Sequence, residues 1–522
     1  MTRQISRFAL MLGLAALTGF AAPATQAETL TEFLSEVYRS NPEITAERAA
    51  LRATDELEPQ ARAGYMPTVN MDISATETHS NDDVDGGSRL SNQTASLTAN
   101  QFLYRGGRTM AGIKQAQALI RAQRAQLTTV EQAVLLEAAT SYYDVVRDQA
   151  VVKLTQNNVR VLGEQLQAAN DRFEVGEVTR TDVAQAVSRV ERAKADRETA
   201  LGQLQISRAA LFRLVGRSPE GALIEPGAVK SWMLPATLEE AVGLAEAQNP
   251  IVLAARNSHD ASEYGIDLAR GQLLPEVAVV GQLQAANNPS AFTDEQTSAS
   301  VSVQASIPLY QAGAVHSQIR EAKETASENF ISIEQALRTA REQAIASWES
   351  LMSSRATIRS RKAQVRASEL ALEGVREESI VGSRTTLDVL DAEQELLDAE
   401  VSLVRAERDE WAAITQLLSA TGQLSPEILA LDVEPYNPDE HYDRVHKQYW
   451  GTATLEEELP RPDSASMDDD FMTLTLDDGE MLPEGEVEDM SVVSDEDMQL
   501  IRIKEGEAED LTRQPPPEKP DY

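Results

Sequence analysis

Two carboxylates close together in the sequence are the first candidates for chemistry. Asp388 and Asp391 are three residues apart in a helical pattern, so they share one helix face about one turn apart. Acids gathered on one face attract cations, and their mutual repulsion raises their pKa values. Acids also favour the N-terminus of a helix, where they simply face water. The two residues alone leave both interpretations open.

Other reactive side chains are sparse. The chain has no cysteine, which excludes disulfides, thiolate metal sites and cysteine nucleophiles. Its five histidines are scattered, and His441 and His446 come with no further ligand pattern. Phosphate-binding loops, dinucleotide-binding glycine motifs, HExxH and GxSxG are all missing from the sequence. We therefore expect no enzyme activity, no catalytic residue, no cofactor and no structural metal site.

Composition narrows the class further. The 522 residues carry a formal charge of −37, with 84 acidic against 47 basic residues. Nucleic-acid binding needs a basic excess, so we expect no nucleic-acid partner. Aromatic residues make up only 5% of the chain, as is typical of extended helices rather than compact enzyme cores.

The first 27 residues have the pattern of a secretory signal peptide. Arg3 and Arg7 precede an apolar run over residues 8–22, and small residues follow up to Ala27. A membrane-spanning helix is the alternative, but the run falls short of the roughly 20 apolar residues that a bilayer requires. We predict export, with cleavage after Ala27 or, alternatively, after Ala24.

An internal duplication organises most of the chain. Asn41-Pro42 recurs as Asn249-Pro250, 208 residues later. From residue 103 onward the offset becomes 206, as in Gly176 and Gly382. We predict repeats at 28–225 and 235–430, joined by a linker at 226–234.

A third segment, residues 431–522, lies outside the duplication. From residue 432 it holds 28 acidic and 7 basic residues. Acidic, proline-punctuated segments without apolar periodicity cannot bury enough apolar surface to fold. We predict a disordered tail that is dispensable for the rest of the protein.

Each repeat contains two stretches of alternating apolar and polar residues, typical of β-strands with one apolar face. Their length, about 10 residues, suits a tilted membrane-spanning strand. The expected lipid-facing residues are Val69, Met71, Ile73, Val301 and Val303. The alternative is a soluble pair of hairpins that packs its apolar face on helices.

Long helices follow the hairpins. Apolar residues step by three and four from Ile113 to Phe173, the seam of a coiled coil. A helix of about 63 residues would be about 95 Å long. Gly176 and Gly382 end the two incoming helices, and Thr179 with Asp182 and Thr385 with Asp388 resemble capping boxes that begin the outgoing ones.

Over residues 28–430 the chain resembles the TolC family of outer-membrane efflux and secretion channels. The resemblance rests on the duplication, on Asn-Pro near the start of each half, and on three motifs: Leu-Tyr-Arg-Gly-Gly at 103–107, Val-Gly-Ser-Arg-Thr at 381–385 and Leu-Asp-Val-Leu-Asp at 387–391. It implies an α+β membrane protein: a homotrimer with a twelve-stranded β-barrel, four strands per protomer, continuous with a periplasmic α-helical barrel.

The implied function is an export duct in the outer membrane of a Gram-negative bacterium, extending into the periplasm. Its partners would be outer-membrane lipid, a periplasmic adaptor and an inner-membrane pump or ABC exporter. By the same resemblance, Asp388 and Asp391 line a closed aperture at the helix tips. Arg384 would tie its helix pair to a neighbour, with Asp182 as its acidic partner. Ser379 replaces the tyrosine that often completes this link.

The number of strands also predicts an oligomer, independently of the resemblance. Four amphipathic strands cannot close a barrel, and open sheet edges are not tolerated in hydrocarbon, so a chain that spans must oligomerise. The rival hypothesis is a periplasmic coiled-coil adaptor or scaffold that does not conduct. An exported hydrolase is a third class, but the sequence offers it no nucleophile or metal cluster.

Overall fold

The computed structural model describes residues 28–80, 88–217, 223–227, 234–290 and 292–452. The chain divides into two compact units, Met1–Gly451 and Thr452–Tyr522. The predicted signal peptide, residues 228–233 of the predicted linker, and the acidic residues from 453 onward lie outside the described part.

The same order of elements occurs twice. The first half holds the helices α1 (Leu30–Ser40), α2 (Pro42–Asp55) and α3 (Leu57–Arg62), the 3-10 turn η1 (Ala63–Tyr65), the strands β1 (Thr68–Ser80) and β2 (Ser88–Arg105), and the helices α4 (Arg108–Glu174) and α5 (Arg180–Val215). The second half holds α6 (Leu238–Gln248), α7 (Pro250–Arg270), η3 (Gly271–Leu273), β3 (Glu276–Ser290), β4 (Thr293–Ser306), α8 (Ala314–Ile380) and α9 (Thr386–Ala420), and α10 (Pro438–Val445) follows it.

The repeated Asn-Pro pair has a structural reason. Asn41 is the N-cap of α2, where its side-chain oxygen accepts a hydrogen bond from the Glu43 amide, and the proline occupies the first helical position. The Asn41 amide group also donates to the Leu214 carbonyl at the end of α5, at 3.1 Å. Asn249 makes the matching bond to Ala420, at 3.0 Å. In each half, the motif therefore joins the start of a short helix to the end of the last long one.

The four strands form one antiparallel sheet in the order β1-β2-β3-β4. In its register Met71 lies opposite Leu97, which lies opposite Leu283, and Gly281 lies opposite Val301. Residues directly opposite each other share a face, so apolar side chains from all four strands gather on one side of the sheet.

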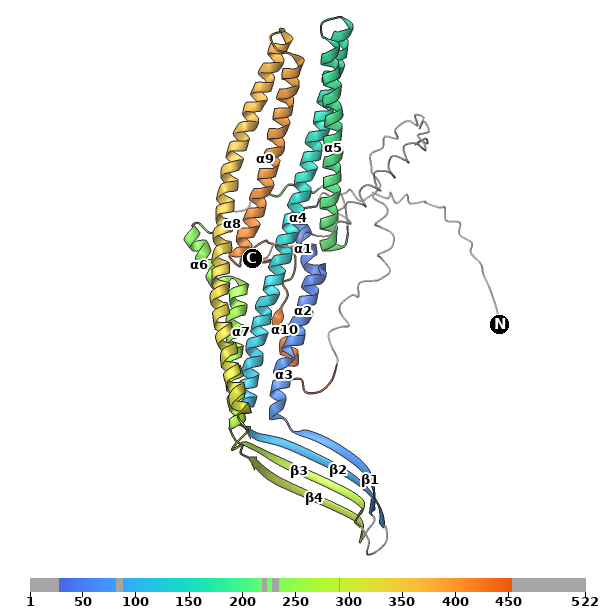
Figure 1. The fold of residues 1–522 in the computed structure, drawn as a ribbon, viewed down its shortest axis with the longest axis vertical. Coiled ribbons are helices and arrows are strands. Elements are labelled where there is room, and N and C mark those ends of the chain that lie inside the picture. The colour runs from blue at the N-terminus through green and yellow to red at the C-terminus, as the bar shows by residue number, and fades with distance from the viewer. Residues whose placement is uncertain (1–27, 81–87, 218–222, 228–233, 291, 453–522) are drawn as a thin grey trace, which may run out of the picture. The chain divides into compact units, whose positions relative to one another are not determined.

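That apolar face is open to the surroundings. Val69, Met71, Ile73, Val301 and Val303 are 61–81% exposed, and no helix of the unit covers them (Figure 1). The prediction that these five residues share one exposed face is confirmed. The opposite face is polar, with Asn70, Asp72, Ser74, Gln282, Gln284, Ser300 and Ser302.

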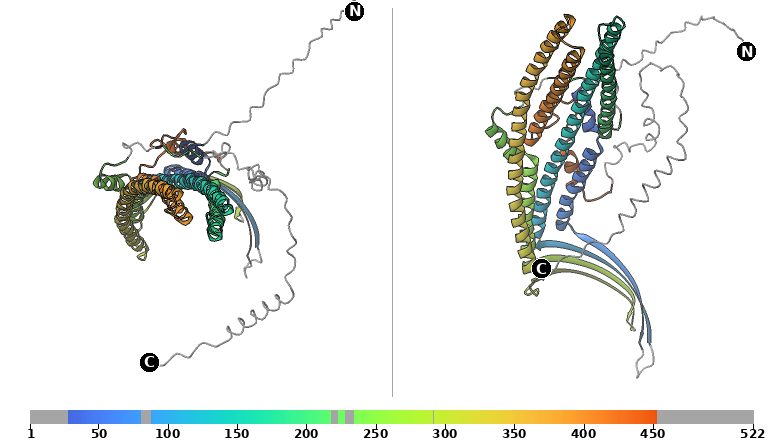
Figure 2. Two further views of the ribbon diagram at one scale, coloured as in Figure 1. Left: turned by 90° about the horizontal axis from the view of Figure 1, so that it is seen from above. Right: turned by 45° about the horizontal axis from the view of Figure 1, so that its top comes forward.

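Two helices of 67 residues each, α4 and α8, run away from the sheet. At 1.5 Å per residue each is about 100 Å long. Near the sheet they pack against α2, α3 and α7, and farther away α4 pairs with α5 and α8 pairs with α9. Seen from above, the long helices follow a curved line (Figure 2). The predicted seam of α4 is largely confirmed, since Ile113, Ile120, Leu127, Val134 and Leu162 are all buried.

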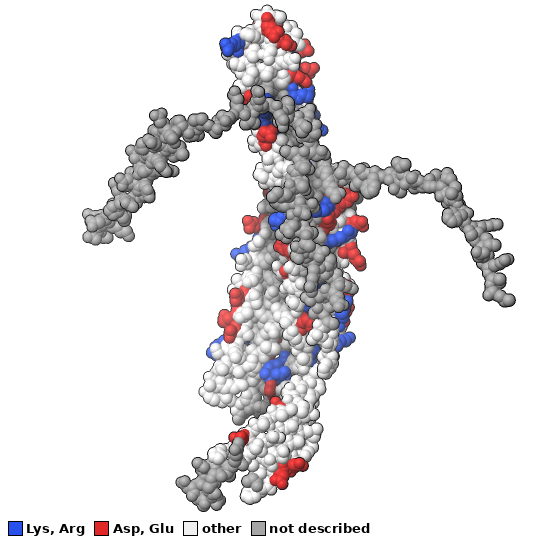
Figure 3. Space-filling view, turned by 90° about the vertical axis from the view of Figure 1, so that its right-hand side faces the viewer, with Lys and Arg blue, Asp and Glu red and all other residues white. Residues whose placement is uncertain are grey.

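No helix among the described residues combines the length and the apolar character needed to cross a bilayer. Charged side chains are spread along the helices, whereas the surface of the strand region is mostly uncharged in the view of Figure 3.

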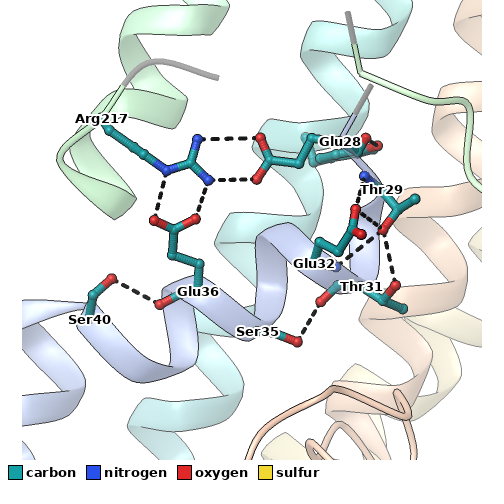
Figure 4. Close-up of polar contacts among 9 residues, drawn as sticks. Glu28, Thr29, Thr31, Glu32, Ser35, Glu36, Ser40 and Arg217 are labelled. Carbon is teal, nitrogen blue, oxygen red and sulfur yellow. Dashed lines mark hydrogen bonds and ion pairs between the residues drawn. The ribbon is translucent and has the colours of Figure 1, made fainter. Parts of the chain in front are cut away.

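The largest apolar core lies midway along the helices, where α1, α4, α5 and α9 meet; we call this region the middle belt. Tyr142 is fully buried in it, and its hydroxyl donates to the carbonyls of Glu28 and Ile224 at 2.8 and 2.7 Å. Burial raises the pKa of this tyrosine. Arg217, just after α5, pairs with both Glu28 and Glu36 (Figure 4), which fastens residues 28–36 to the end of the first repeat.

The predicted disordered tail begins too early. Residues 431–451 belong to the same compact unit as the repeats, and α10 packs against α2. His441 Nδ1 lies 3.0 Å from Asp55 Oδ2, and the Tyr442 hydroxyl donates to Glu58 at 2.6 Å. We call residues 432–451 the C-terminal strap.

The strap folds because it completes buried acids. Asp55 and Glu58 are both 0% exposed, and a buried carboxylate needs partners. Arg124 adds a 2.7 Å ion pair to Asp439 and stacks on the Tyr442 ring. The prediction of disorder rested on the net acidity of the whole segment and took no account of these few specific side chains.

Candidate functional site at the helix tips

Both long helix pairs turn at their far ends through the same short loop. Gly176 and Gly382 have φ of 80° and 79°, a left-handed conformation that a residue with a Cβ rarely adopts. The amides of the following Glu177 and Ser383 bond back to the carbonyls of Arg172 and Glu378. In the structure both glycines therefore occupy the turns that join the two long helices of each pair.

The outgoing helices begin with the predicted capping boxes. Asp182 accepts from the Thr179 amide and hydroxyl, both at 2.8 Å, and Asp388 accepts from Thr385 in the same way at 2.9 Å. These bonds to the backbone and the hydroxyl hold the pKa of both aspartates below its usual range. Within one chain the pKa of Asp388 therefore shifts in the opposite direction to the rise expected for a cluster of acids.

Arg384 is exposed and pairs with Glu378, six residues earlier in the same turn, at 2.8 Å. This bond and the charge of Glu378 raise the pKa of the arginine. Among the described residues no hydrogen bond or ion pair joins Arg384 to Asp182. One chain therefore does not bring the two predicted gate residues together, and a link between them has to cross to a second copy.

The two aperture candidates have different surroundings. Asp391 pairs with Arg189 of α5, whose Nη2 lies 2.5 Å from Oδ1. Asp388 has no ion-pair partner among the residues that the structure describes. No sequence signal pointed to the Arg189–Asp391 pair, because the residues are 202 positions apart and Arg189 belongs to none of the motifs.

A second pair near the tips was also not predicted. Arg376 of α8 binds Glu393 of α9, whose side chain is 8% exposed. This bond lies inside the α8/α9 pair and fixes those two helices to each other.

We next consider whether side chains of one protomer could bind a metal ion. Over the described ranges, no group of three or more histidines, aspartates or glutamates is close enough together to hold a metal ion. A cation site built from Asp388 and Asp391 would require carboxylates from more than one copy.

A sequence model of the outer membrane efflux protein family matches the chain twice, at residues 33–217 and 241–423. The two matches coincide with the two halves of the fold. The outer membrane efflux protein BepC of Brucella suis is 32% identical over 456 residues, which cover 87% of this chain and 97% of that protein. The outer membrane protein TolC of Vibrio cholerae is 26% identical over 422 residues, or 80% and 95% of the two chains.

A solved structure shows the same architecture. The outer membrane protein VceC of Vibrio cholerae superimposes with a TM-score of 0.66 at 20% identity, over 75% of this chain and 96% of that one. The predicted fold class, an α+β membrane protein with four strands per protomer and a long helical column, is confirmed, as is the location in the outer membrane. The duplicated helix–hairpin–helix fold, the tip turns and the twofold match together show that this chain belongs to the outer membrane efflux protein family.

Proposed function

We propose that this protein is the outer-membrane duct of a tripartite efflux or type I secretion system, which conducts substrates passively and is gated at its helix tips. The observation that carries the proposal is the sheet. It has an exposed apolar face, a polar face and two edges, β1 and β4, that are unpaired within the protomer. Unpaired strand edges are not tolerated in hydrocarbon.

The edges can be satisfied by copies of the same chain. If β4 of one protomer pairs with β1 of the next, three copies give twelve strands and a closed barrel with a polar lumen. The apolar face then contacts outer-membrane lipid. The helices, about 100 Å long, extend the lumen into the periplasm.

The energy for transport has to come from a partner. The family consists of channels rather than enzymes, and we expect no catalytic activity here. A periplasmic adaptor and an inner-membrane pump or ABC exporter are the partners that this arrangement requires, and the pump selects the substrate.

The aperture and the gate are proposed for the tips. In a trimer, Asp388 and Asp391 would form rings of three carboxylates around the axis. Arg384, exposed in its turn, would reach Asp182 of a neighbouring copy and close the duct with a link that is reversible because it is solvent-exposed.

Purification in detergent and planar-bilayer recording test the proposal. We expect a trimer that migrates differently on gels when unheated, fractionates with outer membranes and conducts ions. A monodisperse monomer that is soluble without detergent would contradict the duct and favour the non-conducting adaptor.

A further inference from the structure

The two long helix pairs, α4/α5 and α8/α9, touch at two separate heights. The lower contact is the middle belt, where Arg408 of α9 binds Asp144 of α4 at 2.8 Å and the hydroxyls of Tyr143 and Thr415 lie 2.9 Å apart. Apolar side chains of α4, α5 and α9 fill the same level.

Above the belt the two pairs separate around a cavity of about 660 Å³. Its walls come from α4, α5 and α9, and charged side chains of both signs line it, among them Arg192, Asp196, Asp398 and Arg405. Apolar side chains such as Leu397 line the same walls. Charged walls admit water to a space of this size, so no continuous apolar core joins the two pairs at this level.

Beyond the cavity, the helices meet again. Leu390 of α9 is 2% exposed and clusters with Leu162 of α4 and with Val190 and Ala193 of α5. This small apolar cluster is separate from the core of the middle belt. Asp144 and Leu162 are 18 residues apart on α4, so the upper contact lies about 27 Å above the lower one.

The Arg189–Asp391 ion pair stands beside that cluster. Arg189 precedes Val190 and Asp391 follows Leu390, so each charged residue is the chain neighbour of an apolar one in the contact. The side chains are 26% and 57% exposed. The pair therefore stands at the edge of a contact made by four buried apolar residues, against which Val159 and Leu166 also pack.

We infer that Leu390 with its three apolar partners and the Arg189–Asp391 pair form a latch that holds the second helix pair against the first within each protomer. The inference rests on the proposed function, because it assigns the latch to the closed state of the tip gate. Swinging α8/α9 outward breaks this one contact and leaves the middle belt in place as the hinge. Arg376–Glu393 keeps α8 and α9 together while they move.

The latch also sets the charge of the aperture. Arg189 compensates Asp391, whereas Asp388 has no ion-pair partner in the described part of the chain. The closed aperture then presents Asp388 without a direct ion pair, although the charge of Arg384 acts on it, and Asp391 becomes available to cations only when the latch opens.

Bilayer recordings of Arg189→Gln and Asp391→Asn separate the two roles. Both variants break the latch, so both raise the open-state population, by about two- to five-fold for each latch, the range of an exposed ion pair. They differ in their block by La³⁺: Arg189→Gln frees a carboxylate and strengthens block, whereas Asp391→Asn removes it and weakens block. Arg192→Gln is the matched control, since Arg192 lies one turn away and its one ion pair among the described residues is within α5, with Asp196. It should match the wild type in open-state population.

The charge-swapped double variant Arg189→Asp with Asp391→Arg should return the open-state population toward the wild-type value. Because the chain has no cysteine, the double variant Arg189→Cys with Asp391→Cys introduces the only thiols. Cross-linking the two thiols with a cleavable bifunctional reagent should hold the duct closed, and cleavage of the cross-link should release it. Wild-type open-state populations in both single variants, together with an increase in Arg384→Ser, would overturn the latch and leave the tip gate standing. A wild-type protein that does not conduct would overturn the proposed function itself.

Discussion

The middle belt and the helix tips are both built largely from the long helices, yet different forces hold them. In the belt, Tyr142, Leu211 and Leu417 are at most 1% exposed, and Asp148 is buried against Ser207 at 2.6 Å. At the tips, Val175, Ile380 and Val381 are 72–79% exposed, and Arg384 pairs only in a solvent-exposed turn.

The two regions differ in the free energy that is needed to separate their helices. Buried apolar side chains stabilise by about 1.5–3 kcal/mol each, whereas exposed ion pairs contribute about 0–1 kcal/mol. A belt held by buried apolar side chains resists thermal fluctuations. A tip held by exposed ion pairs could be opened by the binding energy of a docking partner. The proposed gate at one end and the proposed hinge in the middle are consistent with where the buried apolar residues lie.

Tyr142→Ala should have the largest effect, because it removes a fully buried ring and both hydroxyl hydrogen bonds at once. We expect a loss of about 3–5 kcal/mol in the free energy of unfolding, measured by denaturant titration of the detergent-solubilised protein. The matched tip variant Val175→Ala should change it by less than about 0.5 kcal/mol. Equal losses in the two variants would show that belt and tip are equally packed.

Truncation of the C-terminal segment should have a smaller effect that depends on where the chain is cut. Removal of residues 452–522 spares the strap, so the free energy of unfolding should stay at its full-length value. Removal from residue 431 onward deprives Asp55 and Glu58 of His441 and Tyr442, at a cost of about 1–3 kcal/mol. If both truncations leave the same free energy of unfolding, the strap contributes nothing to the stability of the protein.

The tip link should have the smallest effect on stability and a visible effect on conduction. We expect Arg384→Ser and Asp182→Ala each to raise single-channel conductance, and the double variant to add little to either, since both changes break one link. Asp182→Ala also removes a capping box, which makes Arg384→Ser the cleaner probe.

Glu378→Gln is the control for that experiment. It removes the partner of Arg384 within its own turn but leaves a link to a neighbouring copy intact, so conductance should not rise. An increase equal to that of Arg384→Ser would place the function of Arg384 inside its own turn. Additive effects of Arg384→Ser and Asp182→Ala would mean that the two residues do not act as a pair.

Much of the fold could be predicted because its signals are local. The left-handed turns at Gly176 and Gly382, the capping boxes at Asp182 and Asp388 and the alternating strand faces each depend on residues a few positions apart. The error at the C-terminal segment has the opposite cause. The average composition of this segment predicts disorder, but two of its residues, His441 and Tyr442, contact buried acids on distant helices.

The sequence by itself determined the duplication, the long helices, the tip turns and the apolar face of the sheet. Only the tertiary structure decided that Arg189 compensates Asp391, that Arg376 binds Glu393, and that residues 432–451 dock on α2. The physical reason is that periodicity and caps specify which face of a helix is buried. They do not specify the rotation and stagger of one helix against another, and those two quantities choose the partner of each charged side chain.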